Sequence, residues 1–125
     1  MDARQICKAT DLSEVNNTMG WIELTEMQEW NKILAESHEV PQFVFKHSTR
    51  CSISSLAKSR VEKRFKAGDK FYLLDLLNFR PISNAIAKDL NIEHESPQVL
   101  VIKNGICTFH VSHSAIDYDE IIAHS

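Results

Sequence analysis

Cys51 is the residue of this chain whose type and position could support covalent chemistry. It follows a polar turn at residues 46–50 and opens a segment, residues 51–68, whose apolar side chains recur with helical spacing. The first turn of a helix carries unpaired backbone N–H groups and the positive end of the helix dipole, and both favour a thiolate over a thiol. Because the thiolate is the nucleophile of thiol–disulfide exchange, we interpret Cys51 as a reactive cysteine.

The side chains around Cys51 are expected to stabilise its thiolate. Arg50 supplies a neighbouring positive charge, and His47 is the nearest histidine in the preceding turn, where it could equally be a solvated residue. Ser52 follows the cysteine directly. The hydroxyl of Ser54 comes three residues after Cys51, from where it could donate a hydrogen bond to the sulfur.

Ser54 also limits the kind of exchange that is possible. It occupies the position where a dithiol oxidoreductase carries its second cysteine, and a hydroxyl cannot resolve a mixed disulfide. A mixed disulfide on Cys51 must therefore be resolved by an external thiol, by Cys7 or by Cys107. The cysteines form no Cys-x-x-Cys pair and, together with the histidines, no metal-binding spacing, so we predict neither a dithiol motif nor a metal site.

The other two cysteines have simpler interpretations. Cys107 alternates with Phe109 and Val111, which predicts that the three share one strand face and that Cys107 is a core residue. Cys7 lies in a polar N-terminal stretch and could reach Cys51 as a resolving thiol, although a cysteine in a tail needs no partner.

Length and composition indicate one compact domain. The chain has 125 residues, 43% of them hydrophobic and 25% charged, and its formal net charge of −3 gives no electrostatic reason to expect nucleic-acid binding. No stretch approaches the roughly 18 consecutive apolar residues of a membrane helix, and no apolar run follows the N-terminal residues as it does in a signal peptide. The expected location is therefore cytoplasmic.

Apolar periodicity and turn residues predict alternating strands and helices. Strands are expected at 21–24, 42–45, 71–76, 98–102 and 106–111, and helices at 25–40, 51–67, 81–90 and 114–122. Capping-box spacings at Thr25–Gln28 and Ser114–Asp117 mark two helix starts, and Asn104-Gly105 marks a hairpin. This order requires a mostly parallel sheet with helices on both faces and a closing antiparallel hairpin.

The predicted fold class is α/β and thioredoxin-like, with a central mixed sheet of four to five strands flanked by helices on both faces. A single domain is expected at residues 21–125, preceded by a polar extension at residues 1–20 that lacks periodicity. Pro97 opens the fourth strand, and in thioredoxin-like folds this proline is cis and packs beside the nucleophile. The backbone of Ser96 would then offer a pairing edge to a bound thiol or peptide, so Thr49, Ser96 and Pro97 are the expected docking residues.

Three sequence blocks resemble the YtxJ family of bacillithiol-system redox proteins, also described as monothiol bacilliredoxins. They are residues 46–54 (KHSTRCSIS), 80–87 (RPISNAIA) and 94–98 (HESPQ), in matching order within a resemblance that runs from about Trp21 to the C-terminus. Many members have proline directly after the cysteine, where this chain has Ser52, and this difference alters the helix start. Arg80 and Asn84 recur in the resemblance, but their role stays open.

The resemblance implies single-thiol exchange. Cys51 would attack an S-bacillithiolated protein and take the bacillithiol onto itself, and free bacillithiol would then release it. The implied partners are thiol-modified client proteins and bacillithiol or another low-molecular-weight thiol as co-substrate, with no tightly bound cofactor, no nucleic acid and no membrane. Whether the protein is an enzyme stays open, because a non-catalytic thioredoxin-fold module that binds partners or senses redox state through Cys51 fits the same residues.

Overall fold

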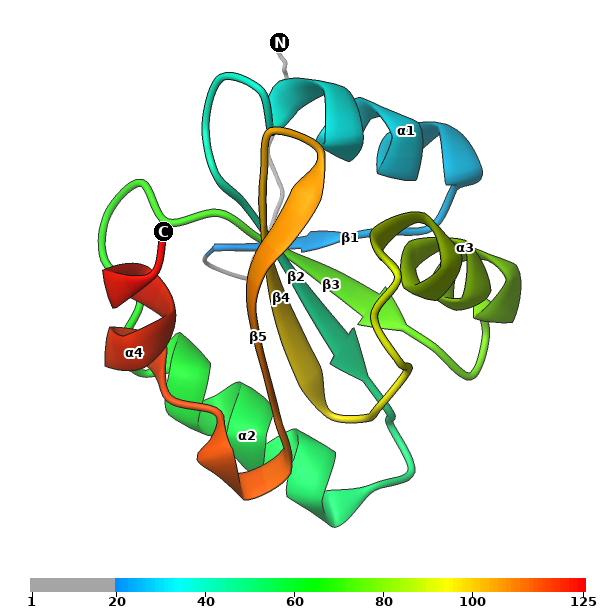
Figure 1. The fold of residues 1–125 in the computed structure, drawn as a ribbon. Coiled ribbons are helices and arrows are strands. Elements are labelled where there is room, and N and C mark those ends of the chain that lie inside the picture. Colours follow the sequence, from blue (N-terminus) through cyan, green and yellow to red (C-terminus); the bar gives the residue numbers. More distant parts are fainter. Residues whose placement is uncertain (1–19) are drawn as a thin grey trace, which may run out of the picture.

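The computed structural model describes residues 20–125, which form a sheet with helices on both of its faces (Figure 1). The strands are β1 (Trp21–Glu23), β2 (Gln42–His47), β3 (Phe71–Asp75), β4 (Gln98–Lys103) and β5 (Ile106–Ser112). The helices are α1 (Met27–Glu36), α2 (Ser52–Glu62), α3 (Arg80–Leu90) and α4 (Tyr118–Ala123), with a 3₁₀ helix η1 (His113–Ala115) before the last. The alternating order predicted from the sequence is confirmed for these residues. Cys7 lies outside them.

The sheet combines parallel and antiparallel strands in the order β1-β3-β2-β4-β5. β1, β3 and β2 run parallel, whereas β4 is antiparallel to both β2 and β5. Parallel neighbours need a crossover between them, and α1 and α2 supply these crossovers. The carboxyl ends of β1, β2 and β3 therefore meet at one edge of the sheet, where ligand sites form in folds of this kind.

Each face of the sheet has its own hydrophobic core. Val44 of β2 packs into a cluster with Trp30 of α1, on the face that α1 and α3 cover. Phe45, the next residue, packs into a second cluster with Val61 of α2, on the face that α2 and α4 cover. Successive strand residues point to opposite faces, so β2 is buried on both sides.

Helix α1 begins later than the sequence predicted. Its N-cap is Glu26, and the helix starts at Met27. Glu29 accepts the backbone N–H of Glu26 at 3.1 Å and that of Thr25 at 2.9 Å. The predicted Thr25–Gln28 capping box is therefore wrong, because the glutamate one position further along reaches back to both free N–H groups.

Helix α2 is shorter than predicted and ends at Glu62, not just before Gly68. Ala57 is fully buried against the sheet. Ile53 and Leu56, which belong to the apolar residues with helical spacing in this segment, are nevertheless 52% and 61% exposed. The side of α2 that meets the sheet is narrow, and this apolar pair lies outside it, in the two turns that follow Cys51.

Helix α4 also begins later than predicted. Asp117, and not Ser114, is its N-cap and accepts the backbone N–H of Glu120 at 3.1 Å. Ser114 belongs to η1, and the chain between η1 and α4 is extended at Ile116. The predicted capping pair at Ser114 is therefore wrong, since its second member is the cap itself.

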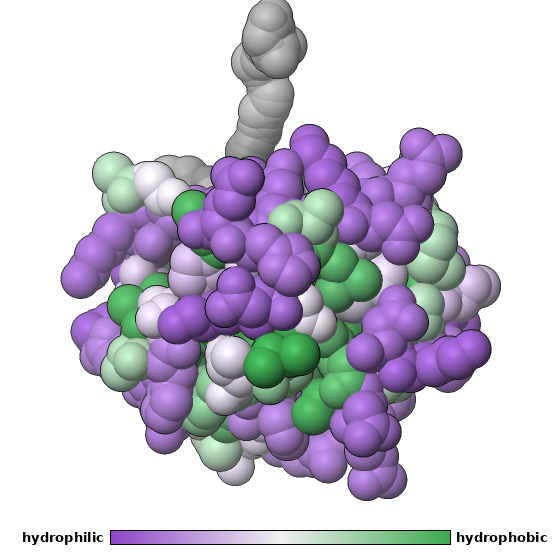
Figure 2. Space-filling view, turned by 45° about the horizontal axis from the view of Figure 1, so that its top comes forward, coloured by the Kyte–Doolittle hydropathy of each residue, from purple (hydrophilic) through white to green (hydrophobic). Residues whose placement is uncertain are grey.

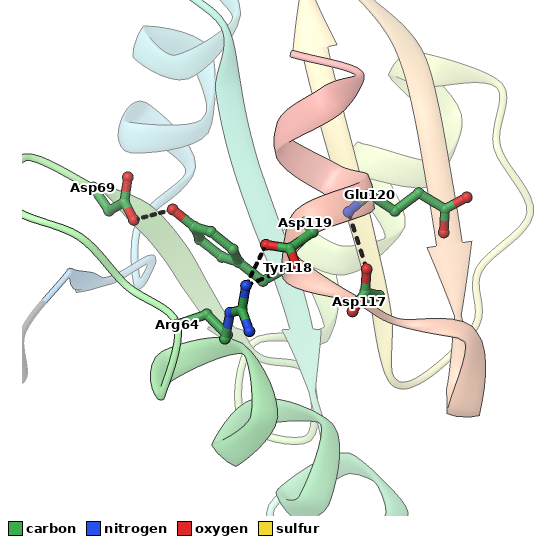
Figure 3. A network of polar contacts seen from close by, with 6 residues as sticks. All are labelled: Arg64, Asp69, Asp117, Tyr118, Asp119 and Glu120. Carbon is green, nitrogen blue, oxygen red and sulfur yellow. Dashed lines mark hydrogen bonds and ion pairs between the residues drawn. The ribbon is translucent and has the colours of Figure 1, made fainter.

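Polar contacts hold α4 against the region between α2 and β3 (Figure 3). The Tyr118 hydroxyl donates a hydrogen bond to the Asp69 carboxylate at 2.5 Å. Arg64 forms a salt bridge with Asp119 at 2.7 Å. Tyr118 is 4% exposed, so burial and the Asp69 carboxylate together raise its pKa to about 12. These contacts hold α4 on the face of the sheet opposite α1 and α3.

A β-bulge changes the face on which Cys107 lies. Val101 of β4 pairs with Phe109, but the next residue, Ile102, pairs with Cys107, so β5 has one extra residue between them. Cys107 packs against the core under α1 and α3, whereas Phe109 and Val111 pack against the core under α2 and α4. The prediction that the three share one face is therefore wrong, although Cys107 does contact a core.

The surface is largely polar. Figure 2 shows hydrophilic residues over most of one face, with small hydrophobic areas between them. Within residues 20–125, the large apolar side chains that are exposed are Ile22, Met27, Val40, Ile53, Leu56 and Ile106. Among the helices in residues 20–125, none has the length and apolar character needed to cross a membrane.

Candidate functional site

Cys51 is the N-cap residue of α2, and it lies just beyond the carboxyl end of β2. Its backbone is extended, with φ −111° and ψ 119°. The Cys51 N–H donates to the carbonyl of Ser48 at 3.2 Å, and the Cys51 carbonyl accepts the N–H of Ser55 at 3.1 Å. The thiol is half-buried and free, so it remains accessible at the positive end of a helix.

Ser52 is the first residue of α2 and is exposed. Proline is favoured at this position because its missing N–H would lack a helical partner anyway and its φ is preset. With serine there the helix nevertheless begins directly after Cys51, and the position contributes a further N–H group to the helix start.

The hydroxyl of Ser54 is fully buried and takes part in two hydrogen bonds. It accepts the backbone N–H of Ser48 at 3.0 Å, and it lies 2.6 Å from Nδ1 of His47. This network joins the end of β2, the following turn and the first turn of α2. A direct hydrogen bond from Ser54 to the Cys51 sulfur stays a prediction.

His47 is buried, with 7% exposure, at the last position of β2. Burial lowers the pKa of its imidazole, the nearby Lys58 ammonium lowers it further, and the Asp75 carboxylate opposes both. The ring is therefore neutral at neutral pH, and one of its two nitrogens is a hydrogen-bond acceptor.

Arg50 and Thr49 are exposed in the turn before Cys51. Together with Leu77 and Asn78 of the β3–α3 connection, they line an open hollow of about 390 Å³. The Arg50 guanidinium, one residue before Cys51, gives this hollow a positive charge.

A smaller cavity of about 140 Å³ is also lined by Thr49. It is formed where the parallel strands end, and its polar lining residues are Glu23, Thr25, His47, Thr49 and Asp75. Both hollows adjoin the Cys51 turn, so they are part of the same edge of the sheet. Within residues 20–125, no group of three or more His, Cys, Asp or Glu side chains could hold a metal ion.

The Ser96–Pro97 peptide bond is cis, and it lies directly before β4. Pro97 is buried, and its carbonyl accepts the N–H of His113 at 2.9 Å. The hydroxyl oxygen of Ser96 is buried and has no hydrogen-bond partner among the described residues. This segment reaches the end of the sheet where β2 leads into α2 (Figure 1), which is the position expected for a docking edge.

The burial of Lys46 was not predicted, because this residue was assigned to the polar turn at residues 46–50. β2 continues through His47, since Lys46 pairs with Leu74 of β3 and with Gln98 of β4, so the predicted turn at residues 46–50 begins too early. The Lys46 side chain is fully buried. No local signal marks this burial, because it depends on the pairing of β2 with both β3 and β4.

The two other cysteines differ in their relation to Cys51. Cys107 of β5 is the pairing partner of Ile102 of β4. Ile102 also pairs with Gln42, the first residue of β2. Cys51 lies beyond the last residue of that strand, so roughly 15 Å of strand separates the two thiols along the sheet. Burial raises the pKa of Cys107, which further disfavours its thiolate. Cys7 lies outside the described residues.

The fold and the site together define a thiol redox protein of the thioredoxin class. A solved protein provisionally described as an oxidoreductase with a thioredoxin fold is 28% identical, with a TM-score of 0.75 over 84% of this chain and 93% of that one. The thioredoxin of Malassezia sympodialis is 17% identical, with a TM-score of 0.64 over 91% and 94% of the two chains. Thioredoxin f of spinach chloroplasts is also 17% identical, with a TM-score of 0.61 over 87% and 94%.

Within that class the sequence identifies a narrower family. Residues 22–121 match the family described as Monothiol bacilliredoxin BrxC, so this chain belongs to the monothiol bacilliredoxins. The predicted family and the predicted thioredoxin-like α/β fold are both confirmed.

Proposed function

We propose that this protein removes bacillithiol from S-bacillithiolated proteins by thiol–disulfide exchange at Cys51. The observation that carries the proposal is the position of Cys51 at the N-cap of α2, with Ser54 where a second cysteine would stand. A single thiol at this position can take up a small thiol as a mixed disulfide but cannot expel it intramolecularly. Membership of the monothiol bacilliredoxin family supports bacillithiol as that small thiol.

In the first step, the Cys51 thiolate attacks the bacillithiol sulfur of the client's mixed disulfide. The disulfide bond of the client breaks as the bond between Cys51 and bacillithiol forms, and the client thiolate leaves and takes a proton from water. The client cysteine is reduced and Cys51 is oxidised, so the electrons balance without a bound cofactor.

In the second step, the thiolate of a free bacillithiol attacks the bacillithiol sulfur held by Cys51. Cys51 leaves as a thiolate, and the disulfide of two bacillithiol molecules is released. Bacillithiol is thus a co-substrate, and the protein returns to its starting state after each cycle. The proposal includes a cytoplasmic location and a redox domain at residues 21–125.

The proposed roles of the neighbouring residues follow from their positions. Exposed Arg50 attracts the anionic small thiol, and the Thr49 side chain borders both hollows beside Cys51. The Ser96 backbone and Pro97 dock the mixed disulfide. The residues proposed to stabilise the thiolate are Arg50, Ser54, His47 and Ser52.

The decisive experiment is the mass of the protein after exposure to oxidised bacillithiol, followed by turnover on a bacillithiolated client. We expect one bacillithiol adduct on the wild type, none on Cys51→Ser, and release of the adduct by free bacillithiol. Cys107→Ala is the matched control, and it should form the same adduct. With excess client and free bacillithiol, the wild type should release many equivalents of client thiol.

Two results would contradict the proposal in different ways. An adduct that persists in Cys51→Ser would mean that another thiol reacts. Release of a single equivalent of client thiol, followed by arrest in the presence of free bacillithiol, would mean that the protein senses or binds instead of turning over.

A further inference from the structure

Lys46 is a fully buried lysine on a strand that leads to the reactive cysteine. Lysine is almost never fully buried unless its ammonium group is paired, because removing the charge from water carries a large free-energy cost. Among residues 20–125, Lys46 forms no salt bridge with a carboxylate. The ammonium group of Lys46 must therefore be stabilised by contacts other than a salt bridge.

The contacts of Lys46 reach two segments that are distant in the sequence. Its ammonium group donates to the main-chain carbonyl of Ser83 at 3.2 Å and lies 3.3 Å from Nδ1 of His94. The Ser83 hydroxyl oxygen is 3.2 Å from the same His94 nitrogen. Lys46 therefore ties β2 to the second turn of α3 and to the connection between α3 and β4.

Gln98 lies beside Lys46 in the sheet and contacts the same connection. The two residues are direct partners in the β2–β4 pairing, and Gln98 is 1% exposed. Its amide nitrogen donates to the carbonyl of Glu93 at 3.1 Å, and its amide oxygen accepts the N–H of Glu95 at 3.4 Å. Two adjacent buried polar side chains thus hold three consecutive residues, 93–95.

Residues 93–95 lead directly into Ser96 and Pro97. The connection at residues 91–97 contains no helix or strand, so its own backbone provides few hydrogen bonds to fix its path. Side chains from the sheet must therefore supply the fixed points. Figure 1 shows this connection passing the end of β2 before β4 begins.

The contact with Lys46 also selects one tautomer of His94. An ammonium group has no lone pair, so the nitrogen that faces it must be an acceptor. Nδ1 of His94 therefore carries no proton, and the proton of the neutral ring lies on Nε2. Loss of Lys46 would release the ring from this arrangement, because the Ser83 hydroxyl can donate or accept.

We propose that Lys46, together with Gln98, is a positioning residue of the docking edge: it fixes residues 93–95 so that Ser96 and Pro97 are held beside Cys51. Lys46 does not contact the reacting sulfur atoms. Its contribution is the orientation of the mixed disulfide during attack, which is sensitive to displacements of about 1 Å. The inference rests on the proposed exchange at Cys51.

The test compares two reagents on the same thiol in wild type, Lys46→Met and Gln98→Met. Iodoacetamide is small and uncharged and needs no docking, whereas a bacillithiolated peptide must dock. We expect the exchange rate with the peptide to fall roughly tenfold in both variants, and the alkylation rate to change by less than about twofold. Lys103→Met, at the other end of β4, is the matched control and should leave both rates unchanged.

Two structural readouts do not depend on the exchange reaction. The ¹⁵N chemical shifts of His94 should report an Nε2–H tautomer in the wild type that is lost in Lys46→Met. Amide exchange of residues 91–97 should become faster, while that of β2 and β3 stays the same. These measurements decide the positioning role even if the wild type itself fails to react with the peptide, which would refute the proposed function separately.

Equal losses of peptide exchange and alkylation in Lys46→Met would overturn the proposal, because the lysine would then act on the Cys51 sulfur through its charge. Unchanged peptide exchange together with an unchanged His94 tautomer would also overturn it. Replacing a buried ion by an apolar residue of similar length is commonly neutral or stabilising, so the variant is expected to fold.

Discussion

The Nδ1 atom of His47 lies 2.6 Å from the hydroxyl oxygen of Ser54, and this contact joins the last residue of β2 to the first turn of α2. Ser54 already accepts the N–H of Ser48, so its own proton is free to go to one partner. When Nδ1 of neutral His47 is an acceptor, the Ser54 proton goes to it. When Nδ1 carries a proton, His47 donates instead, and the Ser54 hydroxyl can turn towards Cys51.

His47 makes the folding stability depend on pH below neutrality. Its folded-state pKa lies below the ordinary 6.5, so in the window just below that value the unfolded chain binds more protons than the native state. Stability therefore falls as the pH decreases through this window. In His47→Gln the neutral amide keeps a hydrogen bond to Ser54 and does not titrate.

Urea denaturation at pH 7 and pH 5 tests this prediction. The wild type should lose more unfolding free energy between these two values than His47→Gln does. His110→Gln, at an exposed strand position, is the control for loss of a histidine and should behave as the wild type. An equal pH dependence in the wild type and His47→Gln would show that the burial of this imidazole has no energetic consequence.

Ser54→Cys should convert the single-thiol site into a dithiol site. Residues three apart on a helix lie about 5–6 Å apart, within the range that a disulfide bridges. After reaction with oxidised bacillithiol, the new thiol should displace the bacillithiol from Cys51. Mass spectrometry should then show the loss of two hydrogens instead of an adduct.

Ser52→Cys provides the comparison for that variant. Adjacent helix residues point in different directions, so a cysteine at position 52 should leave the adduct on Cys51 in place. If the adduct on Ser54→Cys is as long-lived as on the wild type, the side chain at position 54 cannot reach the sulfur of Cys51, and the role proposed for Ser54 fails with it.

Local signals explain why the fold and the position of Cys51 at the start of a helix could be predicted from the sequence. The apolar periods of the strands and helices alternate clearly, and a polar turn followed by a helical period marks Cys51. The hairpin at Asn104-Gly105 was predicted because asparagine and glycine adopt positive φ readily, and in the structure they do so, with φ 54° and 78°. Each of these features depends on residues that are close together in the chain.

The features that the sequence did not predict depend on distant contacts. Lys46 resembles a turn residue until its partners at Ser83 and His94, far along the chain, are brought to it. The face of Cys107 depends on one extra residue in β5, which no alternation pattern reveals. Ile53 and Leu56 follow the helical period, but the tertiary packing of α2 leaves them exposed.

Alanine substitutions at Gly20 and Gly68 should separate the contributions of backbone strain and of steric conflict to the free energy of unfolding. Both have positive φ, 87° and 91°. A Cβ atom at Gly20 would lie 2.5 Å from the ring of Phe65, whereas one at Gly68 would meet nothing within 4 Å. Gly68→Ala should therefore lose about 1 kcal/mol of unfolding free energy from strain alone.

Gly20→Ala should lose about 2–4 kcal/mol, because overpacking against Phe65 adds to the same strain. Urea denaturation of the two variants measures the difference. Phe65→Leu in the Gly20→Ala background should recover part of the loss by providing room for the new methyl group. Equal losses in the two glycine variants would mean that the Phe65 ring moves aside without cost.

The buried ammonium of Lys46 should make the protein more stable as the pH rises above neutrality. Burial lowers the pKa of Lys46 from 10.5 to about 8. Between these two values the unfolded chain binds more protons than the native state, so the Lys46 contribution to stability increases with pH. The shift corresponds to about 3 kcal/mol.

Lys46→Met should therefore be more stable than the wild type at pH 7, and the difference should shrink as the pH approaches 10. Titration of the buried tyrosines affects both proteins alike and cancels in this difference. Urea denaturation of the two proteins at pH 7, 8.5 and 10 provides the comparison, with Lys103→Met as control for the loss of a lysine. A difference that stays constant across this range would show that Lys46 keeps its proton in the native state. In that case its ammonium group would be held more strongly by Ser83 and His94 than burial alone allows.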